Sequence, residues 1–166
     1  MMALSLVIGV LLLAPLASSL PTGIGGSSIQ TAGCNCHNSV ADSSVAANIE
    51  GFPEQYNASA TYELTISFDG GPSQPGNINL GGFNLWASEG VFTPTDGLTS
   101  LWAGSVNEVV HTEAGNDYTS WVVDWTAPES GKEVDFILHV NSVNGDGLQT
   151  GPVSYTHLRA HETCVH

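Results

Sequence analysis

The chain has 166 residues, with 16 acidic side chains against two Lys and Arg, and its formal net charge is −14. Two basic side chains cannot neutralise a phosphate backbone, which excludes nucleic-acid binding, and they cannot form a basic patch for anionic lipid. Because 42% of the residues are hydrophobic and only 11% are charged, the chain is not a disordered acidic tail. Its length fits one domain.

An apolar run over residues 3–20, ALSLVIGVLLLAPLASSL, opens the chain. Ala17 and Ser19 are small residues placed as an export cleavage site requires, so we interpret residues 1–19 as a signal peptide. An uncleaved N-terminal membrane anchor is the alternative, since the run is near the minimum length for a membrane span. Both interpretations place the rest of the chain outside the cytoplasm, in an extracellular or cell-surface location.

Residues 20–44 are rich in Gly, Ser and Thr, and we expect a flexible leader that carries the run Cys34-Asn35-Cys36-His37. Beyond it, short runs of β-branched and aromatic residues alternate with polar ones, between clusters of Gly, Pro, Asn and Asp. Signals for helices are nearly absent. Strands are therefore predicted over residues 45–49, 60–68, 78–88, 98–102, 107–112, 119–126 and 133–141.

Three of these strands show a clear apolar face, formed by Tyr62, Leu64, Ile66 and Phe68, by Trp121, Val123 and Trp125, and by Val134, Phe136, Leu138 and Val140. Gly81-Gly82 predicts a bulge or bend in the strand over residues 78–88. Strands at this spacing, without helices between them, predict an antiparallel two-sheet β-sandwich over residues 45–152, with a β-barrel as the runner-up.

Residues 153–166 read VSYTHLRAHETCVH and differ from the rest of the chain in being rich in His. Back-translated, they fit the codons of a transposon end joined to a sequencing-library adapter. We interpret them as an artefact, exclude them from the predicted domain and expect the natural sequence to differ after Pro152. Residues 1–152 then hold 15 acidic groups, the 16 of the chain less Glu162, and one basic group, Lys132.

Five features in chain order resemble the Reeler-like domains of exported bacterial and archaeal surface proteins, the group called choice-of-anchor V domains. The features are Cys34-Asn35-Cys36-His37, Gly82-Phe83, Trp125-Thr126-Ala127-Pro128, Phe136 and Asn144-Gly145-Asp146-Gly147. The resemblance covers roughly residues 33–151. It implies an immunoglobulin-like or Reeler-like sandwich, used as a secreted module that a variable C-terminal segment holds to the cell envelope, with no catalytic activity attached.

The Cys34-Asn35-Cys36-His37 run is one residue shorter than a Cys-x-x-Cys-His haem attachment motif. Three interpretations stay open: covalent haem c, a strained disulfide or simple thiols, and a copper or zinc site. A further ligand to haem or metal would come from His111 or His139, because the only methionines belong to the export segment. Taken singly, these two histidines are interpreted as surface or edge residues.

The other candidate sites are weaker. Asn141, Asn144 and Asp146 offer oxygen ligands for Ca²⁺, although a plain turn explains them as well. Asn57 begins a glycosylation sequon. No nucleophile, zinc-protease or phosphate-loop motif is found, and we expect no enzyme.

We therefore predict an exported, non-enzymatic surface module with a structural or binding role toward cell-envelope or surface components. The alternative is an extracellular electron-transfer domain that carries haem or metal at Cys34, Cys36 and His37.

Overall fold

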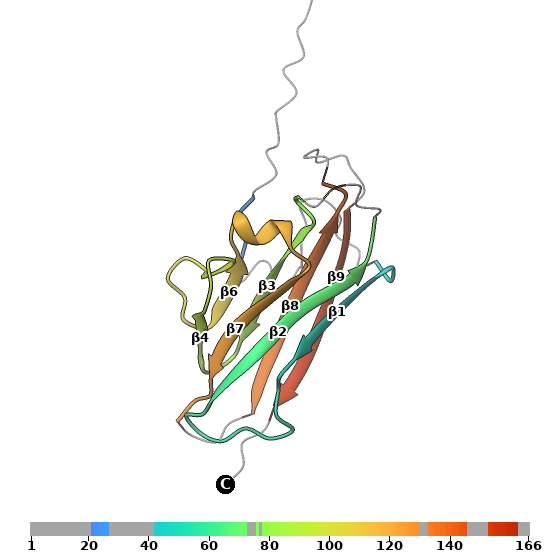
Figure 1. Ribbon diagram of the computed structural model, residues 1–166. Helices are drawn as coiled ribbons and strands as arrows, with labels where there is room; N and C mark the ends of the chain where they lie inside the picture. The colour runs from blue at the N-terminus through green and yellow to red at the C-terminus, as the bar shows by residue number, and fades with distance from the viewer. Residues whose placement is uncertain are drawn as a thin grey trace, which may run out of the picture.

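A computed structural model describes residues 21–26, 42–72, 76, 78–129 and 133–145, and the backbone of residues 153–162. Two antiparallel sheets face each other as the layers of a β-sandwich (Figure 1). The four-stranded sheet has the order β1 (Val45–Glu50), β2 (Thr61–Gly70), β7 (Ser120–Thr126) and β4 (Val91–Pro94). The five-stranded sheet has the order β5 (Thr99–Leu101), β6 (Glu108–His111), β3 (Gly81–Ala87), β8 (Val134–Val143) and β9 (Val153–Glu162). A short 3-10 helix, η1 (Ala114–Asp117), precedes β7.

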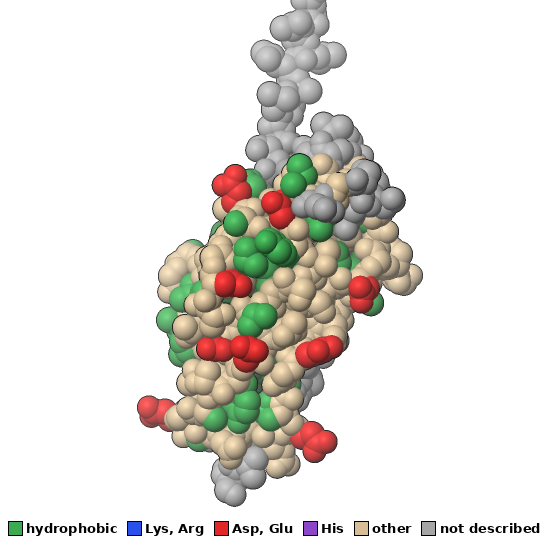
Figure 2. Space-filling model, viewed as in Figure 1, with side chains coloured by type: hydrophobic (Ala, Val, Ile, Leu, Met, Phe, Trp, Pro, Cys, Tyr) green, Lys and Arg blue, Asp and Glu red, His purple; other side chains and the backbone are tan. Residues whose placement is uncertain are grey.

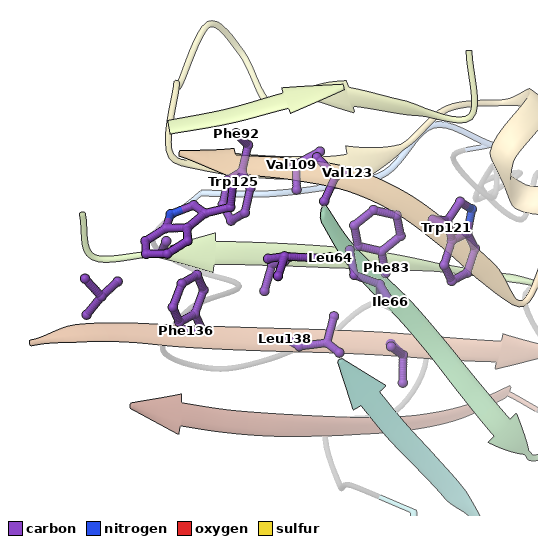
Figure 3. Close-up of a cluster of buried hydrophobic side chains, with 14 of the residues drawn as sticks. Leu64, Ile66, Phe83, Phe92, Val109, Trp121, Val123, Trp125, Phe136 and Leu138 are labelled. Atoms are coloured by element: carbon purple, nitrogen blue, oxygen red, sulfur yellow. The ribbon is translucent and has the colours of Figure 1, made fainter. Parts of the chain in front are cut away.

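The core lies between the sheets and consists of the apolar faces that the alternation predicted (Figure 3). In the β2–β7 ladder, Leu64 pairs with Val123 and Ile66 with Trp121, and all four side chains are buried. Trp125 meets Phe136 of the opposite sheet edge-on, with ring centroids 5.0 Å apart. Each such fully buried side chain stabilises the fold by roughly 1.5–3 kcal/mol relative to an exposed one.

The predicted sandwich is confirmed, and the two sheets do not close into the runner-up barrel. All seven predicted strands are present, with ends that differ by up to three residues. Two further strands lie in the described part of the chain. β4 was not predicted because it has only four residues and ends at Pro94, and an edge strand this short shows little hydrophobic periodicity.

The predicted bulge at Gly81-Gly82 is wrong for the β3–β8 ladder, where Gly81 pairs with Ser142 and Gly82 with Asn141 without a break. The two glycines serve close packing instead. A Cβ at residue 81 would meet the ring of Phe68, and one at residue 82 would overlap the ring of His111.

Residues 153–162, which the sequence interpretation left outside the domain, form β9 and pair with β8 over ten residues. The sandwich in this chain therefore extends past the predicted end at residue 152. The foreign origin of the segment stays a prediction, because antiparallel pairing is made by backbone groups that every sequence except proline supplies.

Candidate functional site

A short segment, residues 21–26, lies against β6 on the outer face of the five-stranded sheet, and we call it the strap. Its Gly23 N–H donates to the carbonyl oxygen of His111 at 3.0 Å. Asn116 of η1 donates from Nδ2 to the carbonyl oxygen of Pro21 at 3.3 Å. Gly23 and Gly25 are buried, and a Cβ at either position would collide with β6 side chains, Val110 and Glu108 respectively. Glycine is therefore required here for the backbone to approach the sheet.

Glu108 is the side chain that binds the strap to the sheet by hydrogen bonds. It begins β6 and is only 3% exposed. Its Oε1 accepts hydrogen bonds from Gly26 N–H at 2.7 Å and from Asn84 Nδ2 at 2.8 Å. No Lys or Arg side chain lies in the described ranges, so these two donors compensate the buried carboxylate there. The arrangement joins the strap to β6 and β3.

Asn84 and Asn141 extend this polar region across the sheet. Asn84 of β3 lies opposite His139 of β8, and Asn141 lies two residues further along β8. The Oδ1 atoms of Asn84 and Asn141 are buried without a hydrogen-bond partner. Together with Glu108 they form what we call the acceptor patch, a set of oxygens that suits a donor group or a water.

Sequence reasoning did not single out Glu108 or Asn84. The available signal was weak: Glu108 directly precedes the apolar pair Val109-Val110, so a charge sits within a short strand. The strap that uses Glu108 lies 82 residues away in sequence, and no local pattern links the two.

Of the two candidate histidines, His139 is buried, so the prediction of a surface or edge residue is wrong for it, whereas His111 is half-buried at the end of β6. His139 is 4% exposed and lies beside Asn84 on the outer face. His111 packs against the core rings of Phe83 and Trp121, with centroids 6.3 and 6.4 Å away. The sheet therefore gives the two imidazoles different surroundings and does not pair them.

His111 is held in its neutral form. Burial lowers its pKa below the ordinary value, and the hydrogen bond with the backbone of Phe83 opposes that shift. Nδ1 lies 3.1 Å from the Phe83 amide nitrogen, whose N–H donates to an unprotonated Nδ1, and 3.2 Å from the Phe83 carbonyl oxygen, which accepts from a protonated Nδ1. Nδ1 is therefore engaged with the backbone of Phe83 in either tautomer.

The remaining predicted site residues are scattered. Cys34, Cys36, His37 and Asp146 lie outside the described residues. Asn141 belongs to β8 and Asn144 follows the strand, so these two calcium candidates do not share one turn. Asn57 is exposed in the loop between β1 and β2, where its N–H donates to the Tyr62 hydroxyl at 2.8 Å. Within the described ranges, no group of three His, Cys, Asp or Glu side chains could hold a metal ion.

No protein-family model and no curated protein match this chain. Among solved structures, it is similar to the Reelin-N domain of F-spondin, with 20% identity over 76% of this chain and 89% of that one and a TM-score of 0.49. The human F-spondin reeler domain has 20% identity over 75% and 91% of the two chains, with a TM-score of 0.48. AvmM, which catalyses macrocyclization in alchivemycin A biosynthesis, is similar at 10% identity over 76% and 91%, with a TM-score of 0.44.

Reeler domains are thus among the solved structures to which this chain is similar, as the sequence resemblance predicted. The narrower assignment to choice-of-anchor V domains stays a prediction. In the part of the chain that the structure describes, no helix is long and apolar enough to cross a membrane.

Proposed function

We propose that the chain is an exported, non-enzymatic β-sandwich module at the cell surface, where it binds cationic components of the envelope. The proposal rests on a pair of like charges on the outer face of the four-stranded sheet, where Glu63 of β2 lies directly opposite Asp124 of β7 in the ladder. Figure 2 shows Asp and Glu side chains spread over this face of the molecule.

Like charges directly opposite one another destabilise an antiparallel pair. Among the side chains that the structure describes, no Lys or Arg compensates them. A cationic partner bound between Glu63 and Asp124 would relieve their repulsion. Binding of such a partner would therefore also stabilise the sheet. The apolar run over residues 3–20 supports delivery of this face to the cell exterior.

Export is tested by expressing the full chain in a bacterial host and adding protease to intact cells. We expect the parent chain to be exposed to protease and a chain lacking residues 1–19 to be protected. A parent chain that stays in the cytosol would overturn the export part of the proposal.

The binding part is tested by retention of the purified chain on immobilised polylysine at about 0.15 M salt, where screening extends over about 8 Å. Glu63→Gln with Asp124→Asn is expected to lower retention more than the matched pair Glu54→Gln with Glu129→Gln, which lies outside the strands. Equal losses for the two pairs would show that only net charge matters.

The second candidate function is an electron-transfer or metal-carrying domain that uses Cys34, Cys36 and His37. One observation favours it: the strap ends at Gly26, where Glu108 holds it beside Asn84, the register partner of His139. Eight further residues reach Cys34 and can span up to about 26–29 Å, so the motif is within range of His139.

Covalent haem would give a Soret band that survives denaturation of protein made with a haem-attachment system, and His139→Ala would shift that band. Colour lost on acid extraction would exclude thioether attachment. A colourless protein whose Cys34 and Cys36 are alkylated only after reduction would establish the disulfide. Bound copper or zinc, lost in Cys36→Ala, would establish the metal site.

A further inference from the structure

Strand β8 has the burial pattern of a strand from the interior of a sheet. On the core side, Val134, Phe136, Leu138 and Val140 are fully buried. On the other side, Ile137 and His139 are 9% and 4% exposed. A strand buried on both faces belongs between two neighbours, because an apolar edge strand promotes uncontrolled pairing. β3 pairs with one edge of β8, and β9 pairs with the other.

The residues of β9 match this position poorly. Directly paired residues share a face of the sheet. Opposite the four buried core residues of β8, the ladder places Glu162, Ala160, Leu158 and Thr156. Only Leu158 is a large apolar residue, and Glu162 lies opposite Val134. The sequence of residues 153–162 therefore lacks the alternating large apolar residues expected of a neighbour to β8.

We propose that the β8 edge is a strand-acceptor site for an extended segment donated by another polypeptide, and that residues 153–162 are an exchangeable occupant of it. The preferred donor has large apolar residues opposite Val134, Phe136 and Val140, the positions at which the ladder places Glu162, Ala160 and Thr156. Opposite the exposed Asp135, a basic residue complements the charge. The inference concerns the sheet edge and holds whether or not the module is exported.

The test uses the full chain with Leu158→Pro and Arg159→Pro. Adjacent residues direct their N–H groups to opposite sides of a strand, so one of the two prolines removes a β8–β9 hydrogen bond. The control carries Thr163→Pro and Cys164→Pro, just past the end of β9. The probe is a fluorescein-labelled ten-residue peptide with Val opposite the four buried core residues of β8, Lys opposite Asp135 and Thr elsewhere.

We expect the proline variant to bind the probe at least about tenfold more tightly than the control. A peptide of the same composition with its four Val residues in consecutive positions should bind much more weakly, because no register places more than two of them opposite the buried core residues of β8. Equal binding by variant and control, or binding of both peptides alike, would overturn the proposal. So would a proline variant that dimerises and excludes the probe, since the edge would then belong to a second copy of this chain.

A second measurement applies where the proline variant does not fold. In the parent chain, Thr156→Val and Glu162→Val change residues opposite Val140 and Val134, whereas Tyr155→Val and His161→Val change the alternate row. The first pair is expected to raise the Tm by about 2–4 °C, as about 1 kcal/mol does in a chain of this size, and the second pair to leave it unchanged. Equal shifts for the two rows would show that the edge does not select residues by face.

Discussion

Substitution of Glu108 tests whether the strap is held by the buried carboxylate. Glu108→Ala removes the acceptor of two hydrogen bonds, from Gly26 N–H at 2.7 Å and Asn84 Nδ2 at 2.8 Å. Glu108→Gln keeps an acceptor oxygen of the same reach and removes only the charge. The two variants therefore separate hydrogen bonding from charge at one position.

The magnitude follows from the two bonds. A hydrogen bond to a charged group contributes about 1.5–3 kcal/mol, so loss of both bonds in Glu108→Ala is expected to lower the free energy of unfolding by about 3–6 kcal/mol. Glu108→Gln is expected to lower it by about 1.5–3 kcal/mol, because neutral bonds are roughly half as strong. At about 2–4 °C per kcal/mol, the alanine variant should melt about 6–24 °C below the parent chain.

The assay is urea unfolding followed by tryptophan fluorescence, with hydrogen exchange of the Gly23 and Gly26 amides as the local readout. Glu54→Ala is the matched control, since its carboxylate is exposed in the loop between β1 and β2. Loss of amide protection in Glu108→Ala but not in Glu54→Ala is expected. If the two alanine variants are equally stable and equally protected, the strap is not held by Glu108 and the argument is refuted.

Two further predictions concern His111 and its neighbour Gly82. Gly82→Ala should lower the free energy of unfolding in urea by about 1–3 kcal/mol, because the new Cβ overlaps the His111 ring. Gly97→Ala, where a Cβ meets open space, should change it little. Similar losses for the two variants would contradict this packing. Burial lowers the pKa of His111, so as the pH falls the unfolded chain binds a proton on this ring at a higher pH than the folded chain does. The stability due to the neutral ring is therefore present above about pH 6.5 and is lost as the pH falls below that value. The parent chain should therefore lose stability between pH 7 and 5 relative to His111→Gln, by at most about 1.4 kcal/mol per pH unit, and a constant difference between them would refute the assignment.

Much of the fold was predictable because its determinants are local. The period-two alternation in Leu64, Ile66 and Phe68 identifies β2 and its buried face without reference to any other strand. The same holds for Trp121 and Trp125 in β7. Predicted ends were less accurate, since strand ends depend on the length of the partner strand and not on the strand's own residues.

The candidate site was not predictable in the same way. His139 and His111 were both visible as histidines, but their burial depends on β3 and β6, which lie far away in sequence. Glu108 was not predicted as a site residue because it is one of 16 acidic residues and no local pattern sets it apart. Its role is set by the strap, whose glycines read in sequence only as a flexible leader.

The sequence by itself determined the acidic character of the chain and its construction from two antiparallel sheets, because charge counts and alternation need no partner to be recognised. Only the tertiary structure decided which side chains meet: Gly26 with Glu108, His111 with Gly82, and residues 153–162 with β8. The physical reason is that shape complementarity and hydrogen bonding bring together residues far apart in the sequence. A local sequence pattern does not reveal which distant residue will be the partner.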